Sequence, residues 1–255
     1  MLLALDAGNT NITIGAFDRG SLMGRWRLRT IREQTADEWG ILLRNIFSLA
    51  NLDLAAVDGM IISSVVPAVD QPLAAMCERY FHRQPLYVTS ATDIGLSIRY
   101  DNPREVGADR LVNAVAAWFK YGGPAVVVDL GTTINFDCVS HDGAFCGGLI
   151  CPGIAMSIGG LFAQTARLPM VDFREPVQLI GTNTIGAIQS GLYYGFTGLI
   201  DGILERVFEE LGDGCKAIAT GGQGHMIARS SRLVKIADED LTLEGLRIIW
   251  ERSRG

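Results

Sequence analysis

A carboxylate follows a run of apolar residues near the start of the chain, where a strand is expected to end. The segment LALDAGNTNITIGAF, residues 3–17, places Asp6 two positions before Gly8, and small polar side chains follow. A glycine in such a turn lets backbone N–H groups approach phosphate oxygens, and hydroxyl and amide groups add hydrogen-bond partners. A carboxylate beside them suits Mg²⁺. The pattern favours binding of a metal-bound phosphate chain, with an ordinary β-hairpin as the alternative.

The same pattern occurs a second time, about half a chain later. VVVDLGTTINFDCVSHDG, residues 126–143, repeats the order of apolar strand, Asp, one residue and Gly, with Asp129 in the place of Asp6. A late apolar run ends in a further pair of glycines, Gly221 and Gly222. The spacing predicts two similar α/β lobes, residues 1–120 and 121–255, each beginning strand, turn, strand, with a cleft between them.

Bulk composition limits the classes of function. The chain has 255 residues, 48% of them hydrophobic and 20% charged, which is typical of a soluble globular protein. The net charge of −6 disfavours a nucleic-acid-binding role, which usually needs a basic face. The first residues include no basic stretch ahead of the apolar run, so no signal peptide is expected.

An uncharged stretch over residues 143–165 is long enough to cross a bilayer. It contains six glycines and Pro152, so a buried strand, a glycine-rich turn and a buried helix are favoured over a membrane span.

Five cysteines without an export signal indicate reduced thiols and a cytoplasmic protein. Cys138, His141, Cys146 and Cys151 lie close together in the sequence, so a zinc site is an alternative to buried small hydrophobes.

Helices and strands are expected to position these turns. Thr35 precedes early acidic residues and apolar residues at helical spacing, which predicts a capped helix. Further helices are expected over residues 68–81, before Gly122, over a long region from 183 to 211, and from Thr242.

Several ordered motifs resemble one family, the type III pantothenate kinases, within the actin/hexokinase/Hsp70-like ATPase superfamily. The motifs are DAGNTN, SSVVP, DNPREVGADRLVNAVAA, GGLICPGIAMS, TARLP and IGTNT. The most specific of them covers residues 101–117. The resemblance implies an α/β fold of two ribonuclease-H-like lobes with mixed sheets flanked by helices.

The resemblance also implies ATP-dependent phosphorylation of pantothenate to 4'-phosphopantothenate, the first step of coenzyme A biosynthesis. Mg²⁺ and a monovalent cation, K⁺ or NH₄⁺, are implied, with pantothenate as substrate, no nucleic acid or membrane partner, and a homodimer with shared active sites. ATP-binding residues would be Asp6, Ala7, Gly8, Asn9, Thr10, Asn11, Ile12, Thr13, Thr132, Gly221 and Gly222. Pantothenate-binding residues would be Tyr100, Gly107, Ala108, Asp109, Arg110 and, from the partner subunit, Thr184.

Three of these residues have more specific implied roles. Asp109 would be the catalytic base, Asp129 would bind K⁺ and Asp6 would bind Mg²⁺. A position early in a helix also predicts that the helix dipole keeps Asp109 ionised. The structural alternatives are an ordinary solvated helix start at Asp109, a strand end at Tyr100 and a helix cap at Thr184.

The second turn departs from the family pattern. Residues 131–137 read Gly-Thr-Thr-Ile-Asn-Phe-Asp, whereas the family usually has Gly-Thr-Ala-Thr-Thr-Phe-Asp. Asn135 retains a hydrogen-bond donor, but Ile134 does not, so a polar contact near the phosphates or the cation is expected to be missing.

Two other classes of function compete with the kinase. One is another small-molecule kinase or a phosphate-ester hydrolase on the same fold, which would lack the motif at residues 101–117. The other is a non-catalytic regulatory accessory protein. The presence of Asp6, Asp109 and Asp129 argues against a dead enzyme.

Overall fold

The computed structural model describes residues 1–254, which divide into two compact units. Unit 1 comprises Met1–Ala116 and the C-terminal residues from Thr242, and unit 2 comprises Ala117–Leu241. The lobes expected from the sequence, 1–120 and 121–255, stay a prediction. The compact units differ from them chiefly in the last helix, which groups with unit 1.

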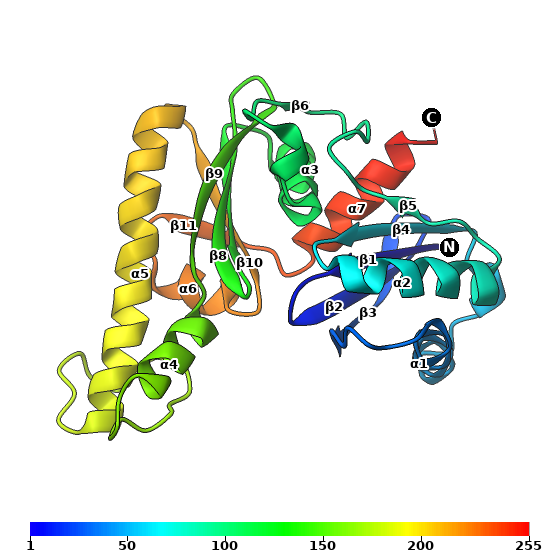
Figure 1. Ribbon diagram of the computed structural model, residues 1–255. Helices are drawn as coiled ribbons and strands as arrows, with labels where there is room; N and C mark the ends of the chain where they lie inside the picture. Colours follow the sequence, from blue (N-terminus) through cyan, green and yellow to red (C-terminus); the bar gives the residue numbers. More distant parts are fainter. Residues whose placement is uncertain (255) are drawn as a thin grey trace. The chain divides into compact units, whose positions relative to one another are not determined.

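Unit 1 contains a mixed five-stranded sheet in the order β3-β2-β1-β4-β5 (Figure 1). β1 pairs antiparallel with β2 and parallel with β4. The strands are β1 (Leu2–Ala7), β2 (Asn11–Asp18), β3 (Ser21–Arg29), β4 (Gly59–Ser64) and β5 (Leu86–Tyr87). The other elements are α1 (Ala36–Leu49), α2 (Pro67–Phe81), the short strand β6 (Ser97–Ile98), the start of α3 (Ala108–Tyr121), and α7 (Leu241–Arg252).

Two helices cover one face of this sheet and α7 packs on the other. Leu5 and Ile14 of the sheet join Leu43 of α1 and Leu73 of α2 in a buried core. On the opposite face the strands have glycines that let α7 approach closely. A Cβ atom at Gly59, for example, would lie 2.1 Å from the Trp250 ring.

The capped helix expected after Thr35 is confirmed as α1. The Thr35 hydroxyl accepts a hydrogen bond from the Glu38 backbone N–H, and the Glu38 carboxylate accepts one from the Thr35 backbone N–H at 2.8 Å. The expected end of α3 is confirmed as well, because Gly122 has φ +72° and its N–H donates to the Trp118 carbonyl.

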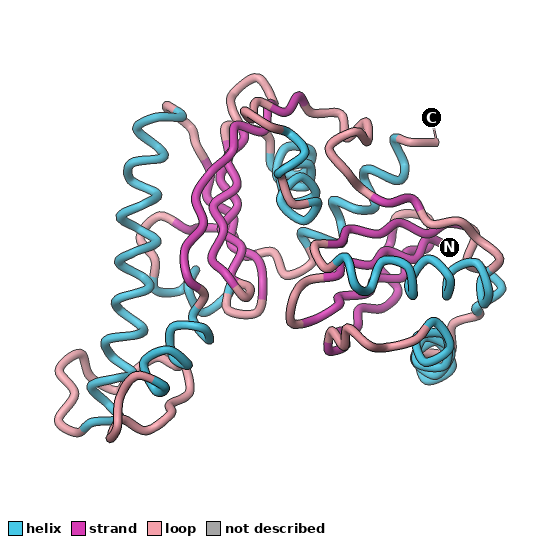
Figure 2. Tube along the Cα trace, viewed as in Figure 1, coloured by secondary structure: helices cyan, strands magenta, loops and turns pink. Residues whose placement is uncertain are grey.

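Unit 2 contains a mixed sheet in which β11, β10, β7, β8 and β9 lie in this order. Figure 2 draws the strands in magenta. Its strands are β7 (Ala125–Leu130), β8 (Thr133–Val139), β9 (Ala144–Pro152), β10 (Lys216–Gly221) and β11 (Val234–Ala237). Its helices are α4 (Ile154–Ala163), α5 (Thr184–Leu211) and α6 (Gly224–Ser230). Phe196, Ile200 and Leu204 of α5 pack on one face of this sheet with Ile227 of α6.

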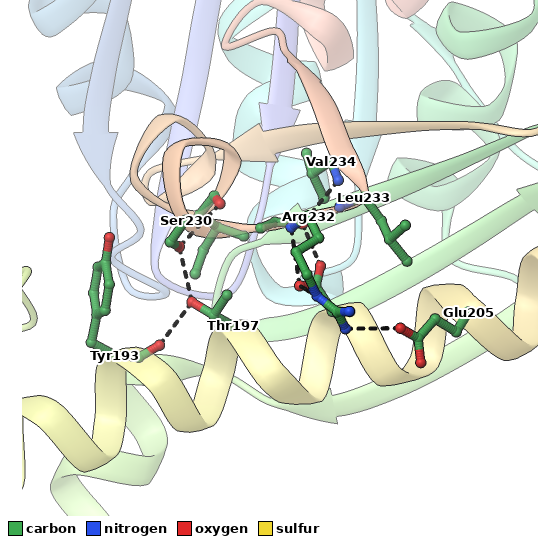
Figure 3. Close-up of polar contacts among 10 residues, drawn as sticks. Tyr193, Thr197, Glu205, Ser230, Arg232, Leu233 and Val234 are labelled. Carbon is green, nitrogen blue, oxygen red and sulfur yellow. Dashed lines mark hydrogen bonds and ion pairs between the residues drawn. The ribbon is translucent and has the colours of Figure 1, made fainter. Parts of the chain in front are cut away.

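A buried polar cluster ties α5 to the segment between α6 and β11 (Figure 3). Asp201, only 3% exposed, accepts hydrogen bonds from the Ser231 hydroxyl and from the Arg232 backbone N–H. One turn of helix away, the Thr197 and Ser230 hydroxyls lie 2.9 Å apart. These bonds fix α5 against the sheet in addition to its apolar packing.

The uncharged stretch over residues 143–165 forms a strand and a helix, β9 and α4, as expected, but the expected burial is wrong for both. In β9, Cys146, Leu149 and Ile150 are exposed. Only Ile154 of α4 is buried, whereas Met156, Leu161 and Phe162 are exposed. Within residues 1–254, no helix combines the length and apolar character needed to cross a membrane. α6 and β11 were not anticipated from the sequence.

All five cysteines are free thiols. Cys77 and Cys138 are buried, but the expectation of burial is wrong for Cys146, which is exposed. The described residues contain no group of three or more His, Cys, Asp or Glu side chains able to hold a metal ion.

Candidate active site

The first glycine turn joins β1 to β2 and carries the half-buried Asp6 at its edge. The Gly8 N–H donates to the Asn11 carbonyl at 3.0 Å, which closes the turn. Thr30, just beyond β3, anchors it from outside, since its hydroxyl donates to the Gly8 carbonyl at 2.6 Å and its N–H donates to Thr10. The turn is therefore held at both ends while its Asn9–Thr10 tip stays exposed.

Asp109 lies at the same end of the unit 1 sheet as this turn. The Val65 N–H, just after β4, donates to the Ala7 carbonyl at 3.1 Å. Gly107 packs on Val65, because a Cβ atom at Gly107 would lie 3.3 Å from Val65 Cγ1 and 2.6 Å from Asp109 Oδ1. A chain of contacts thus runs from the end of β1 to the first turn of α3.

Burial raises the pKa of the Asp109 carboxyl above its ordinary value. A 2.8 Å hydrogen bond from the Arg110 backbone N–H and the Arg110 charge oppose this shift in pKa without cancelling it. Burial therefore sets the direction of the shift in pKa, and ionisation of Asp109 by the helix dipole stays a prediction. A carboxylate with a raised pKa is a stronger proton acceptor, as a general base requires.

The remaining substrate residues expected in unit 1 differ in accessibility. Tyr100 is 37% exposed, whereas Ala108 is 7% exposed and Arg110 is 6% exposed. Such burial is unusual for an arginine, and it excludes the solvated helix start that was the structural alternative for this segment.

In unit 2 the Asp129 carboxylate lies beside Gly221, at the end of β10. Gly221 has φ +81°, and a Cβ atom there would lie 2.7 Å from the Leu130 carbonyl oxygen and 2.8 Å from Asp129 Oδ1. Two oxygens therefore converge on a point that only glycine leaves open. Gly153 approaches the neighbouring turn as closely, since a Cβ there would lie 2.1 Å from the Thr132 carbonyl oxygen. Asp129, Thr132 and Gly221 are thus brought together.

The departure of the second turn from the family pattern is explained by strand alternation. Ile134 is fully buried in the core against α5, so its side chain faces away from the side of the sheet that carries Asp129. Asn135 pairs with Asp129 across the ladder, just as Thr13 pairs with Asp6. The isoleucine therefore removes no polar group from the carboxylate's side of the sheet.

Thr184 begins α5 and is exposed. The cap is the preceding residue, because the Asn183 side chain accepts a hydrogen bond from the Gly186 N–H at 2.9 Å. Residues on either side of Thr184 line a pocket of about 360 Å³ whose polar groups include Arg174 and Gln189.

Comparison with known proteins identifies the family. The model of the type III pantothenate kinase family matches residues 2–206. The chain belongs to the type III pantothenate kinase family. A type III pantothenate kinase of Solibacter usitatus is 66% identical over 253 residues, covering 99% of this chain and 97% of the relative. The one from Koribacter versatilis is 51% identical over 264 residues, covering 100% and 96%.

Solved structures share the fold at low identity. A Campylobacter jejuni protein described as a Baf family transcriptional activator aligns with a TM-score of 0.59 at 19% identity, over 99% of this chain and 98% of that one. A Sinorhizobium meliloti protein described as a 2-dehydro-3-deoxygalactonokinase aligns with a TM-score of 0.53 at 14% identity, over 100% and 96%. These likenesses concern the fold alone.

Membership of the family defines the reaction. The enzyme is a kinase that uses ATP to phosphorylate pantothenate in coenzyme A biosynthesis. The expected α/β fold, with two mixed sheets flanked by helices, is confirmed.

Sequence reasoning missed residues whose importance comes from strand register and close packing. Ser63 and Thr220 pair with Asp6 and Asp129 on neighbouring parallel strands, far away in the sequence. Gly153 is one of the six glycines in the uncharged stretch over residues 143–165. The motifs SSVVP and GGLICPGIAMS were the only signals that marked Ser63 and Gly153.

The close approach at Gly221 generates a testable prediction. Gly221→Ala should destabilise the protein and weaken ATP binding, because the new methyl group would meet two oxygens as well as an unfavourable φ. Gly214→Ala is the control, since Gly214 has φ +79° but open space around a Cβ. Thermal or denaturant unfolding should show a loss for Gly221→Ala about 1–3 kcal/mol beyond that of the control. Equal losses would mean that crowding at Asp129 is unimportant.

Proposed function

We propose that Asp109 is the general base and that the Asp6 and Asp129 turns hold ATP and its cations. The observation that carries this proposal is the half-buried Asp109 carboxylate, with its raised pKa, at the same end of the unit 1 sheet as the Asp6 turn. The family reaction requires a group that accepts the proton of the pantothenate hydroxyl, and a carboxylate of raised pKa suits that task.

The first turn is suited to a metal-bound phosphate chain. Asp6 offers a half-buried carboxylate, a ligand type that Mg²⁺ prefers. The polar tip of the turn, with Asn9 and Thr10, is exposed next to it. When bound, Mg²⁺ would neutralise charge on the phosphates. Residues 6–13, Thr132, Gly221 and Gly222 would contact ATP.

The second carboxylate suits a monovalent cation. Asp129 Oδ1 and the Leu130 carbonyl oxygen converge beside Gly221, and a cation such as K⁺ or NH₄⁺ is held by oxygen atoms of this kind. Such an ion would offset charge that develops on the phosphates. Ile134 faces the core, so the departure of residues 131–137 from the family pattern would leave this cation site unchanged.

In the proposed reaction Asp109 accepts the hydroxyl proton as the pantothenate oxygen bonds to the γ-phosphorus of ATP. The bond from that phosphorus to the β,γ-bridging oxygen breaks at the same time, and ADP leaves. Phosphoryl transfer needs little covalent help, so positioning and charge stabilisation would provide most of the remaining catalysis. Tyr100, Gly107, Ala108 and Arg110 would orient pantothenate around this carboxylate.

Asp109→Asn tests the base directly. It keeps the size of the side chain and removes the acceptor charge, so kcat should fall by about 10²–10⁴ while the ATP Kd changes little. In the unaltered enzyme, kcat/KM should fall on the acidic side at a pH above the ordinary aspartate pKa of about 3.9, because burial raises the pKa of Asp109. Steady-state kinetics against pH and calorimetry measure both quantities.

Glu105→Gln is the matched control, because Glu105 is an exposed carboxylate in the same segment. Its kcat should stay within a few-fold of the unaltered enzyme. A similarly small change in Asp109→Asn would demote Asp109 to a structural residue.

A homodimer with shared sites forms the second part of the proposal. The exposed side of α5 from Thr184 to Leu199 carries no charge, unlike the usual solvent-facing side of a helix. Ile185 is 48% exposed and Tyr194 is 42% exposed, and a Cβ atom at Gly191, Gly195 or Gly198 would meet no other atom. Glycines on one helical face allow close helix packing, so this surface suits a second copy. Thr184 of one subunit would then reach the pantothenate site of its partner.

Subunit mixing tests the shared site. Asp109→Asn and Thr184→Ala should each be poorly active alone, but mixed dimers contain one site with both original residues. Mixing should therefore restore part of the activity, and light scattering should report a dimer.

The control mixture combines Asp109→Asn with Asp6→Asn, whose lesions both lie in unit 1. This mixture should recover nothing, because every site retains one of the two lesions. Recovery in neither mixture, despite demonstrated subunit exchange, would contradict the shared site.

We also propose a cytoplasmic location. Its support is the use of cysteine, since all five thiols are free, a state favoured by reducing compartments.

A further inference from the structure

A polar row crosses the unit 1 sheet at Asp6. Asp6 on β1 pairs with Thr13 on β2 and with Ser63 on β4. Residues paired in register project from the same face, and neighbouring strands lie about 4.8 Å apart. The Ser63 side chain is therefore an immediate neighbour of the Asp6 side chain, on the face opposite the α1 and α2 core.

The Ser63 hydroxyl is buried without a hydrogen-bond partner among the described residues. Ser63 is 0% exposed, and its Oγ makes no hydrogen bond with any residue in the described part of the chain, 1–254. Its neighbour Ser64 behaves normally, because its Oγ accepts a hydrogen bond from the Val66 N–H at 3.2 Å. A buried hydroxyl without a partner destabilises a fold and requires an explanation.

The same arrangement occurs in unit 2. Asp129 pairs with Asn135 on the antiparallel strand and with Thr220 on the parallel strand, and Thr220 is 1% exposed. In both units, then, a buried hydroxyl residue on the parallel neighbour flanks the carboxylate. The pairing of a buried hydroxyl residue with the carboxylate is therefore common to both units.

We propose that Ser63 is a positioning residue for Asp6. When the magnesium–nucleotide complex is bound, the Ser63 hydroxyl donates a hydrogen bond to one oxygen of Asp6 and so directs the other oxygen toward the metal. Carboxylates that bind metals are commonly oriented by such outer hydrogen bonds. The inference rests on the role proposed above for Asp6.

Positioning and packing make different predictions for magnesium binding by Ser63→Ala. Under either role, removal of an unpartnered buried hydroxyl should keep or raise the Tm of the ligand-free protein. If Ser63 only fills space, magnesium binding should stay unchanged, whereas if it positions Asp6, magnesium binding should weaken.

The experiment compares Ser63→Ala with Ser64→Ala in the full chain. Three quantities are measured: the Tm without ligand, the Kd for ADP with Mg²⁺ by calorimetry, and the Mg²⁺ concentration that gives half-maximal activity. For Ser63→Ala we expect an unchanged or higher Tm, and a rise of about 10-fold to 100-fold in the Mg²⁺ requirement. The ADP Kd should rise with it, while the pantothenate KM should stay unchanged. Ser64→Ala should lower the Tm slightly and leave the Mg²⁺ requirement unchanged.

Asp6→Asn separates a failure of the proposed role of Asp6 from a failure of the positioning role of Ser63. If Asp6→Asn raises the Mg²⁺ requirement and Ser63→Ala does not, the positioning role is overturned while the proposed role of Asp6 stands. If Asp6→Asn has no effect, the proposed role of Asp6 fails and the inference fails with it. A lowered Tm in Ser63→Ala would also overturn the inference. Ser63→Ala should add nothing in the Asp6→Asn background, because the two residues act as one unit.

Discussion

The register of a three-strand ladder is the constraint that places the candidate carboxylate in each unit. β1 pairs with β2 on one side and β4 on the other, so Asp6 lies level with Thr13 and Ser63. Because side chains alternate along a strand, a slip of one residue would move Asp6 into the apolar core. Unit 2 repeats the constraint with Asp129. Large apolar side chains such as Leu5 and Val128 fix these registers from the opposite face.

Glycines that allow close packing of the backbone determine which groups surround Asp109 and Asp129. Gly107 lets the start of α3 pack on Val65, which carries Asp109 to the end of β1. Gly221 leaves open the point where the Asp129 carboxylate and the Leu130 carbonyl converge. Burial raises the pKa of the Asp109 carboxyl, a change that suits its proposed role as a base.

The sequence predicted helix boundaries correctly where hydrogen bonds between neighbouring residues determine them. Thr35 with Glu38 marked the start of α1, and Gly122 marked the end of α3. Sequence reasoning failed where packing between distant segments decides the outcome. The apolar α4 was expected to be buried, yet composition cannot reveal whether a partner element covers a helix. Ile134 looked like a lost polar contact, although strand alternation turns it into the core.

The central claim is that two carboxylates in equivalent positions serve different cations, and ion titration of two variants tests it most directly. Activity of Asp6→Asn and Asp129→Asn is measured against Mg²⁺, and against K⁺ replacing Na⁺ at constant ionic strength. The account predicts that Asp6→Asn raises the Mg²⁺ requirement but keeps activation by K⁺, whereas Asp129→Asn loses activation by K⁺ with a normal Mg²⁺ requirement. Identical ion responses in the two variants would contradict it.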